Sequence, residues 1–230
     1  MQEKLKGISV VRFFAISYIV IYVVSIAVNI CVYASVHRKL LVRVNEYNES
    51  ILKSRVENLD KLMSDISVNA VKLSLLKDID KAITYTSDYT ATQRLETLNS
   101  MNNIGYQLSE QVEKNIIYCH NSELILSTNA VDNAQRYYNA YFAPYFNGYE
   151  QWKDYIDHAP SGALLRLSDQ NGNGYAIIYI YQFNAIGRPD CKGTVITQLN
   201  NSLLFSDADM VEYLENSNGE IIAANVDDVN

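Results

Sequence analysis

The sequence predicts an α+β fold, in which long N-terminal helices are followed by an antiparallel sheet that shorter helices cover. Neither glycine nor proline occurs between Gly7 and Gly105, an interval of 97 residues. All three prolines and seven of the nine glycines lie after Tyr106. Because these residues are the strongest breakers of regular structure, we expect helices in the first half of the chain and strands with turns in the second.

The first element is an apolar segment, residues 13–36 (FFAISYIVIYVVSIAVNICVYASV), with 24 positions and no charged side chain. A helix of that length rises about 36 Å, enough to cross a hydrocarbon core of about 30 Å. A signal peptide or a buried helix is the alternative, although the apolar part of a signal peptide normally has only about 7–15 residues. We therefore expect a single transmembrane helix at 13–36 and a location in the cell membrane.

The orientation of this span follows from what comes after it. Basic residues flank both ends about equally, so the positive-inside rule is nearly tied. The rest of the chain is a long acidic segment, and long segments translocate largely regardless of charge. We expect residues 1–12 in the cytoplasm and the remainder outside the membrane.

After the span, apolar residues recur with helical spacing and predict one long amphipathic helix from about 37 to 83. Four of them fall seven apart: Leu52, Leu59, Ile66 and Leu73. This stripe is compatible with packing on the helix's own domain and with a dimer seam of the coiled-coil type. A second amphipathic helix is expected from about Leu95 to Val112.

From Asn115 the pattern changes to that of strands. The segment 116–129 predicts two strands around a turn at 120–123, and YAIIYIYQF at 175–183 alternates as a strand of a hairpin with 163–168. The segment 187–193 (GRPDCKG) is expected to be a turn before a strand at 194–199. A further strand–turn–strand unit is expected at 211–225.

Composition and motifs exclude several functions. The net charge of −7 and the lack of any basic cluster argue against nucleic acid as a partner of this segment. Three cysteines and three histidines show no metal-ligand spacing, so no metal or cofactor is expected. No nucleophile stands at the spacing of a known catalytic motif, and we expect no enzyme activity.

The segment 137–152 (YYNAYFAPYFNGYEQW) contains five tyrosines, two phenylalanines and the only tryptophan of the chain. Pro144 and Asn147-Gly148 divide it into two short helical pieces. The rings fit either a core between these helices and the sheet or the wall of a ligand pocket, since each buried tyrosine hydroxyl needs a hydrogen-bond partner. The residues expected to bind a ligand are Tyr138, Tyr141, Tyr145, Trp152, Arg166, Tyr179 and Tyr181.

Three of these assignments depend on which face of the sheet the side chain points to. Arg166, alone among apolar neighbours, is either an outward strand position or an anchor for a ligand carboxylate or phosphate. Tyr179 and Tyr181 are expected to face the aromatic segment across the pocket. Aromatic stacking on a sugar or another uncharged polar solute fits this composition.

Four segments carry a family resemblance: NIIYCHNSELILSTN (115–129), FNGYEQWKDYI (146–156), GTVITQLNNSLL (193–204) and VEYLENSNGEIIAAN (211–225). Their order resembles the extracytoplasmic Cache sensor module, a PAS-like fold, of bacterial transmembrane receptors, in its double-Cache form. The nearest likeness is to membrane-bound AraC-type transcriptional regulators and sensor histidine kinases. The arginine and the acidic residue of the amino-acid-binding subset are missing, since Glu150-Gln151 precede Trp152 and Asn200 stands at the end of the last strand.

The resemblance implies a PAS-like antiparallel sheet and a sensor lobe at 37–205, followed by the start of a truncated second lobe at 206–230. It also implies a non-catalytic, membrane-anchored domain that senses a small extracellular ligand and belongs to a signal-transduction receptor, with an output domain outside this sequence. A homodimer through the long helix is expected. The alternatives are a histidine kinase, a chemoreceptor, another membrane-tethered enzyme, or a purely structural helical ectodomain.

Overall fold

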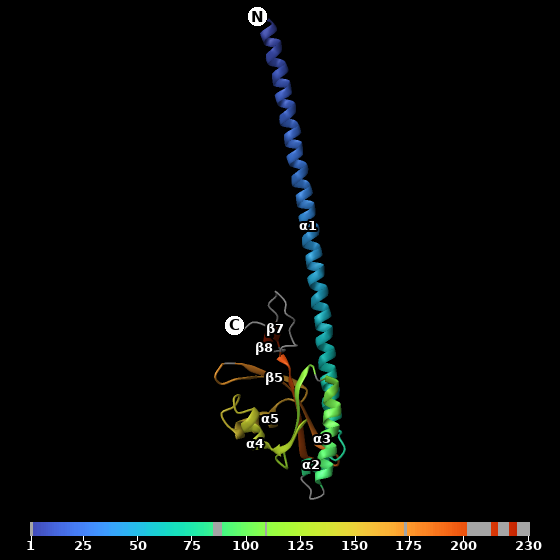
Figure 1. Ribbon diagram of the computed structural model, residues 1–230. Helices are drawn as coiled ribbons and strands as arrows, with labels where there is room; N and C mark the ends of the chain where they lie inside the picture. Colours follow the sequence, from blue (N-terminus) through green and yellow to red (C-terminus); the bar gives the residue numbers. More distant parts are fainter. Residues whose placement is uncertain are drawn as a thin grey trace. The chain divides into compact units, whose positions relative to one another are not determined.

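The computed structural model describes residues 2–84, 89–108, 110–172, 174–201, 213–215 and 221–224. It is an α+β structure: a long N-terminal helix is followed by a six-stranded antiparallel sheet with helices (Figure 1). The chain divides into two compact units, Met1–Asn58 and Leu59–Asn230.

The first unit consists of the greater part of helix α1, which spans Gln2–Ser74. The large apolar side chains between Phe13 and Val36 are exposed. This stretch is long and apolar enough to cross a membrane, as the sequence predicts. The prediction that the helix continues to residue 83 is wrong, because Asp78 adopts a left-handed backbone conformation (φ 64°) after the helix ends at Ser74.

Two more helices follow in the second unit, α2 (Ile79–Thr84) and α3 (Ala91–Gly105). Thr90 and Gln93 form a reciprocal capping box that fixes the start of α3. The expected continuation to Val112 is wrong, since a short 3₁₀ turn follows α3 and Val112 opens strand β1.

The sheet has the strand order β3-β2-β1-β6-β5-β4, and all neighbours pair antiparallel. Its strands are β1 (Val112–Cys119), β2 (Leu124–Ser127), β3 (Val131–Asn133), β4 (Ala163–Ser168), β5 (Tyr175–Ala185) and β6 (Arg188–Leu199). The short edge strand β3 is absent from the sequence prediction. The expected turn at 187–193 is mostly strand, because β5 and β6 stay paired up to Ala185 and Arg188.

The final strand–turn–strand unit is present as β7 (Tyr213–Glu215) paired with β8 (Ile221–Ala224). Its expected turn lies outside the described residues, as does the whole segment 202–212. Ile222 of β8 is buried in the same apolar core as the end of α1.

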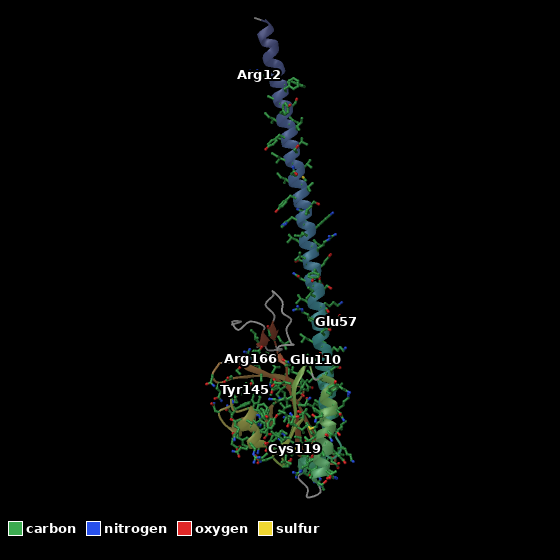
Figure 2. All side chains as sticks on the ribbon, in the orientation of Figure 1. Arg12, Glu57, Glu110, Cys119, Tyr145 and Arg166 are labelled. Atoms are coloured by element: carbon green, nitrogen blue, oxygen red, sulfur yellow. The ribbon has the colours of Figure 1, made fainter. Side chains whose placement is uncertain are left out.

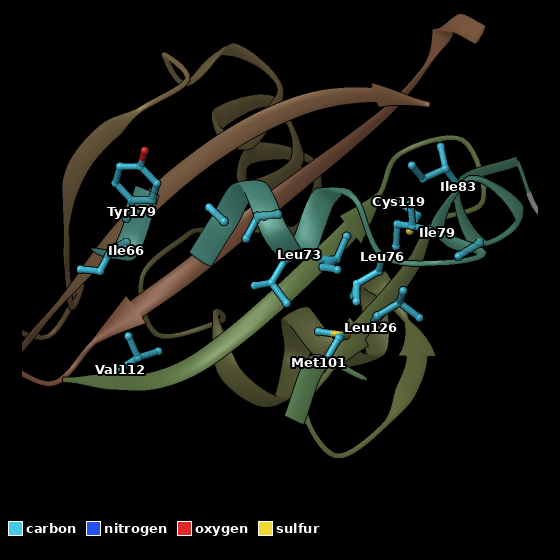
Figure 3. Close-up of a cluster of buried hydrophobic side chains, with 14 of the residues drawn as sticks. Ile66, Leu73, Leu76, Ile79, Ile83, Met101, Val112, Cys119, Leu126 and Tyr179 are labelled. Atoms are coloured by element: carbon cyan, nitrogen blue, oxygen red, sulfur yellow. The ribbon is translucent and has the colours of Figure 1, made fainter. Parts of the chain in front are cut away.

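Because successive side chains of a strand point to opposite faces, the sheet has two separate cores. The helix-face core lies between the sheet and helices α1, α2 and α3, and includes Ile66, Leu73, Met101, Ile117 and Ile177 (Figure 3). The lid-face core lies between the opposite face of the sheet and a lid, which we define as residues 134–158. It contains Ile116, Ile178, Ile180 and Ile196 from the sheet.

Candidate functional site

The lid is formed by two short helices, α4 (Ala134–Tyr141) and α5 (Tyr149–His158), so the predicted division into two helical pieces is confirmed. The Asn133 side chain caps α4 by accepting hydrogen bonds from the backbone N–H groups of Gln135 and Arg136. The turn between the helices is held by Tyr138, whose Oη donates to the Phe146 carbonyl at 3.0 Å. The lid is therefore a defined structure with a bend around Pro144.

Trp152 is the centre of the lid-face core. Its side chain is completely buried and is surrounded by four rings. The ring centroids lie 5.1 Å from Tyr118, 5.5 Å from Phe142, 5.6 Å from Tyr149 and 6.0 Å from Tyr138. These separations are within the range in which aromatic pairs stabilise each other, so the rings form one packed cluster.

Several polar atoms of this cluster are buried without a hydrogen bond. Within the described part of the chain, Trp152 Nε1, Tyr118 Oη and Tyr149 Oη have no hydrogen-bond partner. Most buried polar atoms in folded proteins are paired, because an unpaired one costs about 1–3 kcal/mol. Trp152 and Tyr118 are fully buried residues, so these two groups in particular require an explanation.

The two tyrosine hydroxyls also affect each other. Burial raises the pKa of Tyr118 strongly, and the neighbouring Tyr149 raises it further. Burial likewise raises the pKa of Tyr149, while Tyr118 acts in the opposite direction. The two hydroxyls are thus close enough to interact electrostatically. Both remain protonated at neutral pH, and each keeps a proton to donate.

His120 connects this cluster to the end of helix α5. Its ring lies 4.4 Å from the ring of Tyr118, and its Nε2 is 2.7 Å from the Thr194 hydroxyl. Its Nδ1 is 2.6 Å from Asp157 Oδ1. The His120 ring therefore makes a close polar contact with the Asp157 carboxylate.

The protonation of His120 is set mainly by burial. Burial lowers its pKa, and the positive charges of Lys192 and Lys153 act in the same direction, whereas Asp157 opposes them. The net direction is downward, so the ring is neutral at neutral pH. Asp157 consequently has no buried cation as its partner here.

The lid-face core therefore gathers aromatic faces, an indole N–H and two tyrosine hydroxyls around Trp152. The thiol nearest in sequence, Cys119, lies in the helix-face core, and burial raises its pKa to about 12. A thiol protonated in this way is a poor nucleophile. Among the described residues, no group of three metal-binding side chains is present.

Of the predicted ligand-binding residues, the structure places Tyr138 and Trp152 in ring contact, and Tyr145 packs against the same core. Tyr179 and Tyr181 belong to the helix-face core, so the expectation that they face the lid is wrong. Strand alternation explains the error: β5 is apolar on both faces, and it is Ile178 and Ile180 that point toward the lid.

None of the three remaining predicted residues is among the four rings that surround Trp152. Tyr141 is largely exposed, with the Lys114 ammonium 4.3 Å from its ring centroid. Tyr145 is half-buried at the edge of the lid-face core (Figure 2). Arg166 pairs in register with Ile177 of the helix-face core, so its side chain is on the face of the sheet opposite the lid, exposed and stacked on Tyr175 at 4.3 Å.

Sequence reasoning missed Tyr118, His120, Tyr149, Asp157 and Thr194. One signal was available for the first two, since residues two apart in a strand share a face. The segment IIYCH therefore places Tyr118 and His120 beside each other once the facing of the strand is known. The positions of Asp157 and Thr194 depend on how α5 and β6 approach β1, which local patterns do not determine.

No protein-family model matches the chain, and no curated protein or solved structure is detectably similar to it.

Proposed function

We propose that this chain is the ligand-sensing region of a bacterial signal-transduction receptor, anchored in the membrane with its sensor domain extracytoplasmic. The observation that carries the proposal is the group of buried polar atoms under the lid, on Tyr118, Tyr149 and Trp152. In a stable protein core, buried polar atoms normally have hydrogen-bond partners. A ligand that accepts hydrogen bonds from the indole and from the two hydroxyls would satisfy them.

The long helix supplies a route for the signal. The last turns of α1 place Ile66, Ala70 and Leu73 in the helix-face core, fully buried. The same helix contains the apolar stretch 13–36. A ligand that prefers one arrangement of the lid also displaces the sheet, which lies between the two cores. This displacement reaches α1 through these three contacts. The size of the response is limited by the difference in ligand affinity between the two arrangements.

The nature of the ligand follows from the charges around the cluster. Lys153 is paired with Glu123, with 2.9 Å between Nζ and Oε1. The carboxylate of Asp157 disfavours an anion, and the packed rings favour a molecule with flat apolar faces and polar edges. We propose a small uncharged polar solute such as a sugar.

Two further parts of the proposal concern the receptor as a whole. The resemblance to Cache-containing receptors supports an output domain of the AraC type, which binds DNA outside this segment. Exposed apolar residues of α1 between 37 and 58, such as Leu52 and Val56, support a homodimer in which two copies of the helix pair.

The proposed function is tested by thermal unfolding of the full chain in detergent micelles, screened with neutral sugars, amino acids and small carboxylates. We expect a neutral polar compound to raise the melting temperature. The increase should be lost in Tyr149→Phe, which removes only a hydroxyl of the cluster. It should persist in the matched control Tyr179→Phe, whose hydroxyl is on the other face. A compound whose effect is lost in Tyr179→Phe and kept in Tyr149→Phe would place the site elsewhere.

A further inference from the structure

Three polar side chains, Tyr22, Ser25 and Asn29, lie close to the middle of the apolar stretch 13–36 of α1. At a helical rise of about 1.5 Å per residue, Ser25 is next to the midpoint of the stretch, Tyr22 is about 4 Å from it and Asn29 about 7 Å. When the stretch spans a membrane, as the proposed function requires, all three are inside the hydrocarbon core, whose half-thickness is about 15 Å.

These three residues, which we call the polar stripe, share one face of the helix. They are spaced three and four positions apart, and this spacing places side chains one above the other in an α-helix. Their side chains are exposed. The opposite face is aliphatic and consists of Ile16, Val20, Val23, Ala27 and Ile30. The stretch therefore has a polar and an apolar side, although it carries no charge.

Hydrogen bonds within the helix satisfy Asn29 only in part. Ser25 Oγ donates to the Ile21 carbonyl at 2.9 Å, and Asn29 Nδ2 donates to the Ser25 carbonyl at 2.9 Å. An asparagine amide has two N–H groups and an oxygen with two lone pairs. One N–H group and Oδ1 of Asn29 are thus left without a partner among the described residues. Inside a bilayer no water is present to bind them, so a neighbouring helix has to do so.

A second copy of the same helix is the partner that fits the polar stripe. The asparagine amide is self-complementary, because the free N–H group of each copy can donate to Oδ1 of the other. Two copies inserted in the same direction also place their Asn29 residues at the same depth. Among the described residues, α1 is the one helix long and apolar enough to cross a membrane, so no other described span of this chain can cover the stripe.

We propose that the polar stripe is the contact surface of a parallel homodimer of membrane-spanning helices, in which the two Asn29 side chains hydrogen-bond to each other. Hydrogen bonds between polar side chains drive helix association in membranes, and small residues such as Ser25 let two backbones approach closely. This inference rests on the membrane anchoring in the proposed function. It adds a dimer contact at 22–29 that is separate from the pairing of residues 37–58.

The strength of the contact is measured on the full chain in phosphatidylcholine vesicles. Two samples carry a donor or an acceptor dye on the N-terminal amine, and energy transfer at increasing lipid-to-protein ratio gives the dissociation constant. We expect Asn29→Leu to raise this constant about 3- to 30-fold. The matched control is Ser17→Val, because the Ser17 hydroxyl is off the stripe and donates to the Phe13 carbonyl of its own helix at 2.9 Å. It should change the constant by less than about twofold.

The face of the contact is tested by disulfide cross-linking in the same vesicles with copper phenanthroline. The natural Cys31 is two positions after Asn29 and therefore on another side of the helix, so the unmodified chain should form little cross-linked dimer. In a chain that carries Cys31→Ala, Ser25→Cys should cross-link readily and Ala27→Cys should not. Cys119 and Cys191 remain in every variant and contribute the same background.

Three results would overturn the inference: an unmodified chain that is monomeric at every lipid ratio, an unchanged dissociation constant in Asn29→Leu, or equal cross-linking from positions 25 and 27. The first of these would mean that the stripe faces a helix other than its own copy. Extraction of the chain from the vesicles by alkaline carbonate would contradict the membrane anchoring as well. A failed ligand screen would contradict the ligand-sensing proposal and leave the dissociation constant unchanged, so the two proposals fail separately.

Discussion

The two faces of the sheet bury similar numbers of strand residues but use different chemistry. The helix-face core is built largely from aliphatic side chains, such as Ile66, Leu73 and Ile117. The lid-face core gathers Trp152 and its neighbouring rings on a few isoleucines of the sheet. Unpaired polar atoms occur on both sides, since Asn69 of α1 is buried with no hydrogen-bond partner among the described residues. On the helix face, Tyr89 Oη and Arg94 Nε are also unpaired among the described residues, and the Arg94 guanidinium lies 5.5 Å from the Tyr89 ring centroid. The lid face differs in that its unpaired atoms belong to a cluster of aromatic rings around Trp152.

This difference indicates that the helix-face core serves stability and the lid-face core serves binding. Aliphatic packing maximises stability, because it buries apolar area without polar atoms that need partners. An aromatic cluster with unpaired donors is a less stable solution, and such local violations are typical of functional sites. We therefore expect substitutions on the helix face to act on stability alone, and substitutions on the lid face to separate stability from binding.

The largest effect is expected for Leu73→Ala, which removes a fully buried side chain from α1. The transfer of the lost methyl groups and the remaining cavity together should lower the free energy of unfolding by about 3 kcal/mol. Urea unfolding followed by circular dichroism gives this value.

The matched control is Leu75→Ala, two residues further on, where the side chain is 67% exposed. A change within about 0.5 kcal/mol is expected there. Equal losses at both positions would mean that the helix-face core is not organised as described.

A smaller effect is expected for Gln182→Leu on the lid face. Its Nε2 donates to carbonyls at the end of α5, and leucine cannot replace these hydrogen bonds. The loss should be about 2 kcal/mol, and it should make Trp152 more accessible to acrylamide.

Gln198→Leu serves as its control, because Gln198 makes one solvent-exposed hydrogen bond to Glu113. It should change stability by less than about 0.5 kcal/mol. If Gln182→Leu leaves the quenching of Trp152 unchanged, Gln182 does not fasten the lid.

The sequence predicts the helices and strands well where local sequence patterns determine them. The absence of breakers before Gly105 predicts the helical half, and strand alternation predicts the hairpins. The end of α1 was misplaced because the left-handed conformation of Asp78 has no glycine to mark it. The expected turn at 187–193 was wrong because pairing with β5 outweighs the turn preference of Pro189, at the start of a strand where proline is tolerated.

The candidate site was only partly predictable. Periodicity finds Tyr138 and Trp152, since both are on short amphipathic helices. The facing of β5 could not be read from its sequence, because both of its sides are apolar. That ambiguity placed Tyr179 and Tyr181 on the wrong face. His120 and Asp157 are 37 positions apart, and only the tertiary fold brings them together.

The central claim is that the lid-face core keeps polar atoms that the folded chain itself does not use. Tyr118 and Tyr138 test it directly, because both are buried, both contact Trp152, and they differ in their hydrogen bonds. The measurement is the free energy of unfolding of Tyr118→Phe and Tyr138→Phe, each compared with the unmodified chain. We predict a gain of about 1 kcal/mol for Tyr118→Phe and a loss of about 1 kcal/mol for Tyr138→Phe. A loss in Tyr118→Phe as large as that in Tyr138→Phe would contradict the account.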